Sequence, residues 1–184
     1  MGNLLEAALD TDKGVHIMQS EINSVRERLA SVGFMLPSAQ ETTFNYLPVA
    51  FHERVAYLAG QIAKVGDKIL YQGRVGEEVT FEQAKEATEV TIGQALAWID
   101  VSCGGLENVE RILRMEFFVS VGRDFDRNSE LADVASRLLA VAFGDNGRHP
   151  RSVIGVSRLP RHAPVLIQLT LSLNSPVAAA AGMV

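Results

Sequence analysis

The chain has 184 residues, a length typical of one domain with short extensions. Its hydrophobic content of 47% and charged content of 21% are ordinary for a globular domain with a buried core. The pI near 5.4 disfavours a dedicated nucleic-acid-binding protein, and no apolar run is long enough to span a membrane. Glu6, Asp10 and Asp12 stand where a secretory signal peptide would need a basic and then an apolar region.

Cys103 is the only cysteine, which excludes an intramolecular disulfide and fits the reducing cytoplasm, where we expect the protein to be. Gly104 and Gly105 follow it, so a buried position at a helix end is favoured over a reactive nucleophile. The four histidines are scattered and show no spacing typical of metal ligands. We therefore expect no metal and no other cofactor.

The chain begins with a predicted extension over residues 1–19, whose short apolar cluster allows at most a short helix. The folded domain is expected over residues 20–173, and an Ala-rich tail over residues 174–184 is expected to play no part in the core. Ser20 is the candidate N-cap of the first helix of the domain. This helix is expected to end at Gly33, and its apolar residues recur at helical spacing: Ile22, Val25, Leu29 and Val32.

Residues 34–48 contain two prolines and are predicted to be a loop. Two strands follow over residues 54–62 and 68–72, joined by a turn at Gly66-Asp67. Thr80–Gln83 forms a capping-box pattern that starts a long helix, which runs to the paired glycines after Cys103. One face of this helix consists of Ala84, Ala87, Thr88, Thr91, Ile92, Ala95, Leu96 and Ile99, and the small residues among them favour close packing on a sheet.

A third strand is predicted over residues 109–120, with two opposite faces. One face holds Leu113, Met115, Phe117 and Val119, and the other holds Ile112, Arg114, Glu116 and Phe118. A second long helix is expected to start with Asn128 or Ser129 as its cap and to end near Gly144. Its inward residues are Leu131, Val134, Leu138 and Ala142.

The last two strands are predicted over residues 151–158 and 165–173, and Pro160 and Pro164 bracket the turn between them. We expect these two strands to form a hairpin. The element order is therefore ββαβαββ after one extra N-terminal helix, which predicts an α+β fold whose sheet carries two helices on one face.

The other face of this sheet is predicted to be partly apolar as well. On the last strand Val165, Ile167, Leu169, Leu171 and Leu173 face one way, and Leu166, Gln168, Thr170 and Ser172 face the other. A second apolar face needs a cover, which another copy of the same chain can supply. We therefore predict a homo-oligomer.

Arg151 is the leading candidate for a ligand-binding residue. It opens an apolar strand, so its planar fork of donors, suited to a carboxylate or a phosphate, is expected on a rigid element. No Asp or Glu follows Asp145, and the last 39 residues carry a formal charge of +4. Since the whole chain is −5, the first 145 residues carry −9. A cationic end on an acidic protein favours a small anionic ligand over a polyanion.

An ordered set of motifs connects the chain to a known family. The motifs are Asn45-Tyr46, Val55–Gln61, Gly73–Gly76, Gly104–Val109, Val141–Gly144, and Gly147–Ser152 continuing to Leu159-Pro160. With this order and spacing the chain resembles the RidA/YjgF family, also called endoribonuclease L-PSP or chorismate mutase-like, and more closely its longer bacterial subgroup. The resemblance covers about residues 20–173.

The resemblance implies a homotrimer whose sheets form a central barrel, with a ligand cleft at each subunit interface. Active members of the family hydrolyse reactive enamines and imines and release ammonia and a 2-keto acid. Arg151 matches the arginine that binds the substrate carboxylate, and Tyr46 matches a tyrosine that lines the cleft, although it can also be a packing residue. Gly60 follows the position at which the family has a serine that helps to hold the substrate.

Two residues depart from the family pattern. Ala59 stands in place of that serine, so one hydroxyl is lost. Gln168 stands where a glutamate that activates water is expected, and no later acid can replace it. A glutamine can hold a water molecule by hydrogen bonding but cannot accept its proton.

His149 is a candidate replacement for the missing proton carrier. It lies two residues before Arg151, and Pro150 favours an extended backbone, so both side chains are expected on the same side. Histidine titrates near neutrality and can act as acid or base. The alternatives are a polar loop residue or subunit contact for His149, and a subunit-interface salt bridge for Arg151. Glu116 is a second candidate acid, unless it pairs with Arg114.

Three functions remain open at this point. The first is an enamine or imine deaminase with an altered site, for which Arg151, His149 and Gln168 are the candidate catalytic residues. The second is a non-catalytic trimer that binds a small carboxylate. The third is the endoribonuclease of the family's alternative name, which the acidic composition disfavours because RNA binding needs clustered cations.

Overall fold

The computed structural model describes residues 24–39 and 45–177. The predicted extension over residues 1–19, the predicted cap Ser20 and the last seven residues of the predicted tail lie outside the described residues. Within the described residues, no helix is both long and apolar enough to cross a lipid bilayer.

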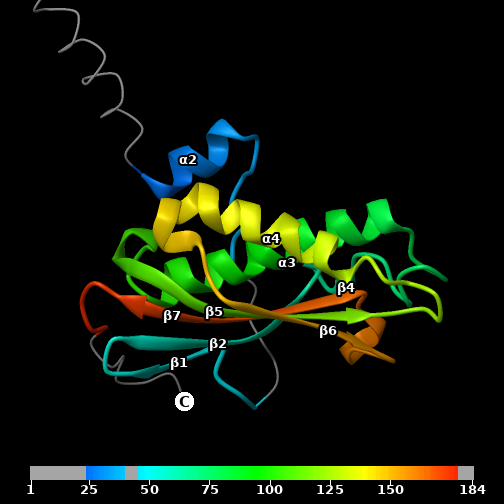
Figure 1. Ribbon diagram of the computed structural model, residues 1–184. Helices are drawn as coiled ribbons and strands as arrows, with labels where there is room; N and C mark the ends of the chain where they lie inside the picture. The colour runs from blue at the N-terminus through cyan, green and yellow to red at the C-terminus, as the bar shows by residue number, and fades with distance from the viewer. Residues whose placement is uncertain (1–23, 40–44, 178–184) are drawn as a thin grey trace, which may run out of the picture.

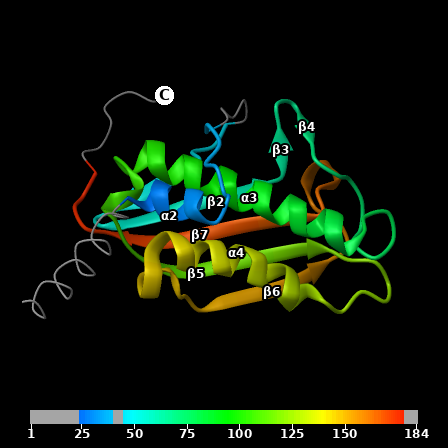
Figure 2. The same ribbon diagram turned by 90° about the horizontal axis from the view of Figure 1, so that it is seen from above.

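The fold has two layers, a mixed sheet and the helices that cover one of its faces (Figures 1 and 2). The strands occur in the order β1-β2-β7-β5-β6 across the sheet. They are β1 (Val49–His52), β2 (Val55–Ile62), β5 (Val109–Ser120), β6 (Arg151–Val156) and β7 (Val165–Leu173). The long helices α3 (Phe81–Ser102) and α4 (Asn128–Phe143) pack on this sheet, and α2 (Val25–Ser31) lies above them. The predicted α+β class is therefore confirmed.

Five short elements link these layers at the edges. They are β3 (Lys64–Val65), β4 (Lys68–Ile69) and the 3-10 turns η1 (Leu106–Asn108), η2 (Gly144–Gly147) and η3 (Pro160–His162). The strands β3 and β4 pair only with each other across Gly66-Asp67, so the predicted strand over residues 68–72 is not part of the main sheet.

The core lies between the sheet and the helices, and its central strand behaves as predicted. Every second residue of β7 from Val165 to Leu173 is buried, and the residues between them are half-buried. The small residues of α3 face this strand and β2, which permits the close approach of helix and sheet. Cys103 is fully buried at the C-terminal end of α3, as the two following glycines indicated.

The strand β1 was not predicted, because the turn that precedes β2 carries no sequence signal. The hairpin β1–β2 turns at Glu53 and Arg54, and Glu53 adopts a φ of 53°, a conformation usually taken by glycine. Because this turn has no Gly, Pro or Asn, no local signal marks residues 49–52 as a strand separate from β2.

The predicted hairpin between the last two strands is wrong. The strand β6 pairs in parallel with β5, and β7 pairs on the other side of β5 in the antiparallel sense. The reason is the helix α4, which carries the chain from the end of β5 back to the start of β6 and so forms a parallel crossover. Pro160 lies in η3, which leads from β6 past the end of β5 to β7.

The strand β5 has the predicted bounds but not the predicted faces throughout. The register shifts between Ile112 and Arg114, and as a result Ile112 is buried whereas Leu113 is exposed. In α4, Leu139 is fully buried and Leu138 is only half-buried, one position away from the predicted stripe.

Three further boundaries differ from the predictions. Ser24, rather than Ser20, caps α2, and it forms a complete capping box with Glu27. The cap position of α4 is Arg127, without a side-chain hydrogen bond, because Asn128 already belongs to the helix. The start of the tail is held in place, since the hydroxyl of Ser175 donates to Asn108 Oδ1 at 2.9 Å.

The face of the sheet that the helices leave open carries one apolar row across four strands. Register pairs place Ile62 beside Leu166, Leu166 beside Phe118, and Phe118 beside Ile154. The next row is polar and consists of Gln168, Glu116 and Ser152. Ile154 is 42% exposed, so this row is available for contact with another molecule.

Candidate functional site

Arg151 projects from the edge strand β6 towards α4. Its register partner is Met115, whose side chain is fully buried on the helix-covered side. The guanidinium Nη1 donates to Ser136 Oγ at 2.8 Å and lies 2.7 Å from Asp133 Oδ1. Its Nη2 donates to the Ser129 carbonyl at 3.4 Å. Within one chain, Arg151 is therefore held on one face of α4 by an ion pair with Asp133.

The side chains of His149 and Arg151 both contact Ser136. The carbonyl oxygen of Gly147 lies 2.6 Å from His149 Nδ1 and can only accept, so Nδ1 carries the proton. His149 Nε2 is then an acceptor and lies 3.4 Å from Ser136 Oγ. A serine hydroxyl can accept from Arg151 and donate to His149 at the same time. We call Arg151, His149, Ser136 and Asp133 the arginine cluster.

The electrostatic surroundings keep His149 neutral. Burial lowers the pKa of His149 below the ordinary histidine value, although the hydrogen bond to Gly147 partly opposes this effect. The positive charge of Arg151 lowers the pKa further. A neutral imidazole whose Nε2 is unprotonated can accept a proton at neutral pH, which is what a general base requires.

The turn η2 positions both residues against α4. Gly147 lies so close to this helix that a Cβ at its position would overlap the carbonyl oxygen of Leu139. After it, the Met115 amide donates to the Pro150 carbonyl at 3.2 Å, which joins the start of β6 to β5. His149 and Arg151 are thus held between a close helix contact and a strand contact.

Gln168 lies on the opposite side of the sheet from the arginine cluster. Its register partner is Glu116, in the polar row of the open face. Glu116 pairs with Arg114 at 3.2 Å, and Arg114 also donates to Ser152 Oγ at 3.0 Å, so this acid is paired as the simpler interpretation proposed. Within one chain, the sheet itself separates Gln168 from Arg151.

Ala59 and Gly60 belong to β2, and Tyr46 lies in the loop before β1. Tyr46 is 48% exposed in the loop before β1. The amide of Ala59 donates to the Pro48 carbonyl at 2.9 Å, at the place where the pairing of β2 with β7 is irregular. Gly60 packs against the side chain of Leu166, where a Cβ would lie only 2.8 Å from Leu166 Cδ2. We call these three residues and Gln168 the second group; Gly60 and Gln168 lie on the open face, which the sheet separates from Arg151.

Sequence reasoning missed Ser136 and Asp133. Both lie on α4, 15 and 18 residues before Arg151, in a helix whose pattern predicts only an inward apolar face. Their contact with Arg151 depends on how closely η2 turns the chain back along α4. The only sequence signal is an acid and a hydroxyl three residues apart on one helix face.

A family model described as "YjgF/chorismate mutase-like, putative endoribonuclease" matches residues 26–173. The chain belongs to the YjgF family. Protein TCP17 of Trypanosoma cruzi is 28% identical over 152 residues, which cover 82% of this chain and 95% of that protein. The range matched by the family model includes the sheet, the helices α3 and α4, and the arginine cluster.

Two solved structures resemble the chain over most of its length. A protein of unknown function from Agrobacterium tumefaciens has a TM-score of 0.76 at 28% identity, covering 88% of this chain and 99% of its own. A "putative endoribonuclease" from Shewanella oneidensis has a TM-score of 0.77 at 28% identity, covering 82% of this chain and 100% of its own. Yeast Mmf1, at 18% identity and a TM-score of 0.53, shares the fold alone.

Proposed function

We propose that this YjgF protein is a cytoplasmic Rid-type deaminase that hydrolyses a small enamine or imine bearing a carboxylate. Water adds to the carbon of the C=N bond, the C–N bond then breaks, and the products are a 2-keto acid and ammonia. The observation that carries this proposal is the arginine cluster, in which the guanidinium of Arg151 and the neutral imidazole of His149 contact the same hydroxyl, that of Ser136.

The substrate carboxylate takes the place that Asp133 occupies on Arg151. The side chain of Asp133 is 56% exposed and can move into solvent, whereas Arg151 is held on a strand. The carboxylate forms two parallel hydrogen bonds with the guanidinium, which fixes the C=N bond next to the cluster. His149 Nε2 then accepts a proton from the attacking water, either directly or through Ser136.

The second group of residues is supplied by a neighbouring copy in a homotrimer. Gln168 and Gly60 lie on the open face of the sheet, whereas Arg151 faces α4, so one chain presents two separate groups of candidate residues. A cleft between copies joins them, with Gln168 holding the water that His149 activates. General acid–base assistance contributes about 10²–10⁴-fold in rate, which His149 must provide in the absence of a glutamate.

The test is hydrolysis of 2-iminopropanoate, generated in the assay by a pyridoxal-phosphate dehydratase, with ammonia release as the readout. We expect Arg151→Ala to lower kcat/KM on the order of 100-fold, because the carboxylate loses its position. Arg151→Lys keeps the charge but loses the fork, so it should recover only a small part of the rate. Arg123→Gln is the matched control, since Arg123 is exposed in the loop after β5 and should leave the rate unchanged.

A non-catalytic trimer that binds a small carboxylate is the second candidate. The observation in its favour is Gln168, which cannot act as a base. Ligand binding that needs Arg151, without ammonia release above background in the wild type, would support this candidate and contradict the deaminase.

An endoribonuclease is the candidate that the composition favours least. The chain is acidic, and only names favour this function: the family description and that of the Shewanella oneidensis relative. RNA cleavage whose substrate affinity falls steeply with salt and which survives Arg151→Ala would favour it over both other functions.

A further inference from the structure

A cavity lies at the end of β6 that is away from the arginine cluster. Its volume is about 330 Å³, large enough for a small metabolite. It opens where the parallel strands β5 and β6 end, between the loop that carries Gly73 and the turn η3. Ligands commonly bind at the carboxyl ends of parallel strands, where loops and unpaired backbone groups converge.

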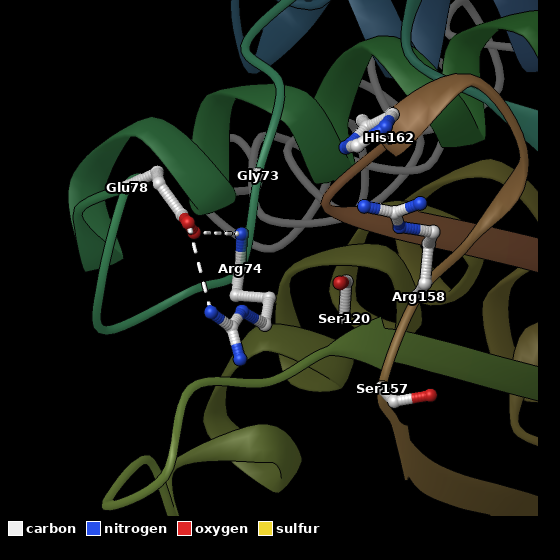
Figure 3. A pocket seen from close by; sticks show the side chains of 7 residues that line it. All are labelled: Gly73, Arg74, Glu78, Ser120, Ser157, Arg158 and His162. Atoms are coloured by element: carbon white, nitrogen blue, oxygen red, sulfur yellow. Dashed lines mark hydrogen bonds and ion pairs between the residues drawn. The ribbon is translucent and has the colours of Figure 1, made fainter.

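One wall of this cavity is cationic. Arg158 and His162 project next to each other from the segment that follows β6 (Figure 3). Both side chains are exposed, and within the described residues neither makes a hydrogen bond or an ion pair. Ser120, which is only 3% exposed, presents its hydroxyl on the floor between them and the other wall. An arginine fork, an imidazole and a hydroxyl are the donors that a carboxylate requires.

The opposite wall is an ionised carboxylate with spare accepting capacity. Glu78 Oε2 accepts the backbone N–H of Arg74 at 2.8 Å, and Oε1 lies 3.8 Å from the Arg74 guanidinium, beyond hydrogen-bonding distance. Backbone hydrogen bonds from Arg74 and from Glu78 itself hold the pKa of Glu78 below its usual value. Arg74 forms its closer ion pair with Glu77, so Arg74 is committed within the chain.

The loops that form the cavity are held rigidly. The Gly73 amide donates to the His162 carbonyl at 2.8 Å, and a Cβ at Gly73 would overlap Glu78. Arg161 and His162 both have left-handed backbones, with φ of 56° and 59°. Two consecutive strained residues persist only where the surroundings fix them, and such strain is concentrated at binding sites.

We propose that this cavity binds a small α-amino or α-hydroxy carboxylate. The carboxylate lies on Arg158, His162 and Ser120, and the amino or hydroxyl group donates to Glu78 Oε1 across the cavity. Glu78 also disfavours a dianion such as phosphate, because a second negative charge would face its carboxylate. This ligand site is independent of the deaminase proposal, since it shares no residue with the arginine cluster.

The test follows two histidine side chains by NMR during titration with L-alanine, L-lactate and propionate at millimolar concentrations. His162 reports on this cavity and His149 on the arginine cluster, and His162→Gln and His149→Gln assign their resonances. We expect L-alanine and L-lactate to shift the His162 resonance saturably. Propionate, which has no donor for Glu78, should bind about 10-fold more weakly.

Variants separate the two sites. Arg158→Gln should weaken the His162 response about 10-fold or more, and Glu78→Gln should abolish the preference for L-alanine over propionate. Arg54→Gln removes the same charge from an exposed turn at the far end of the sheet and should have no effect. A His162 resonance that does not move, or a response that Arg151→Gln abolishes and Arg158→Gln does not, would overturn the proposal while leaving the deaminase test intact.

Discussion

Ser136 shows how one small side chain can organise two functional groups. Its hydroxyl accepts from Arg151 and faces His149, and these two contacts span 15 and 13 residues of sequence. The predicted placement of His149 and Arg151 on the same side agrees with this geometry, because both reach the same serine. The prediction came from the extended backbone that Pro150 imposes, which is a local effect. The serine itself could not be predicted, because it arrives from another element.

The half-buried His149 should make stability depend on pH in a specific direction. The fold favours neutral His149, so the unfolded chain binds more protons once the pH falls below about 6.5. The stabilising contribution is complete above that pH and is lost as the pH falls towards the lower pKa of the folded protein. We expect His149→Gln to reduce the loss of Tm between about pH 8 and about pH 5, as measured by calorimetry.

His52→Gln is the control for this measurement. His52 is exposed on β1, so its replacement should leave the pH dependence of Tm unchanged. Identical pH profiles for wild type and His149→Gln would contradict the inferred neutral state of His149.

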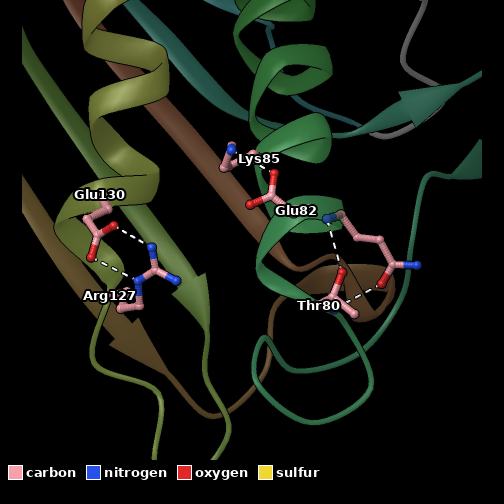
Figure 4. Close-up of polar contacts among 6 residues, drawn as sticks. Thr80, Glu82, Lys85, Arg127 and Glu130 are labelled. Carbon is pink, nitrogen blue, oxygen red and sulfur yellow. Dashed lines mark hydrogen bonds and ion pairs between the residues drawn. The ribbon is translucent and has the colours of Figure 1, made fainter.

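The two long helices show how far local sequence signals specify an element. Thr80 and Gln83 form the predicted capping box of α3, with Thr80 Oγ1 accepting the Gln83 amide at 3.2 Å (Figure 4). The start of α4 was predicted less well. Arg127 occupies its cap position and pairs with Glu130 at 2.6 Å. The guanidinium carbon of Arg127 also lies 3.6 Å from the centroid of the Phe81 ring in α3, so a contact between helices replaces a local cap.

The turn η2 is the element that depends most on a single residue. Gly147 lies against the backbone of α4, where no Cβ can be accommodated without moving the helix or the turn. We expect Gly147→Ala to destabilise the protein by more than about 3 kcal/mol in urea unfolding, because backbone atoms cannot move aside as side chains can.

Gly155→Ala is the matched control on β6. Its Cβ would meet the side chains of Val121, at 3.2 Å, and Asn128, at 3.4 Å, and no backbone atom as close as at Gly147. The control should therefore cost much less than Gly147→Ala. Equal stabilities of the two variants would show that η2 is not packed as closely as the structure indicates.

At the scale of the whole molecule, the open face of the sheet is the basis on which we predict assembly. The row formed by Ile62, Leu166, Phe118 and Ile154 crosses four strands without helical cover. We expect light scattering after gel filtration to show a trimer for the wild type and smaller species for Ile154→Asp. A charge in this row has to be desolvated on assembly, which is costly.

The assembly prediction also bears on activity. If the site is completed between copies, Ile154→Asp should lose ammonia release together with the trimer, although Ile154 does not touch the arginine cluster. Val65→Asp places the same charge on β3, outside the main sheet, and should leave both properties unchanged. A monomeric variant with full activity would contradict a site shared between copies.

The sequence by itself determined the elements whose signals are local. The α+β class, the bounds of β5, the alternation of β7 and the start of α3 all follow from periodicity and capping within a few residues. Arg151 also stood out locally, as a cation at the start of an apolar strand in a segment without acids.

Only the tertiary structure decided which strands pair and which side chains meet. The strand β6 lies beside β5 because α4 returns the chain in parallel, and the local prolines gave no indication of this. The same crossover brings Ser136 and Asp133 to Arg151 and sets the end of β6, with Arg158, beside the loop that carries Glu78. Such contacts join residues far apart in sequence, and they depend on the packing of whole elements, which no short pattern encodes.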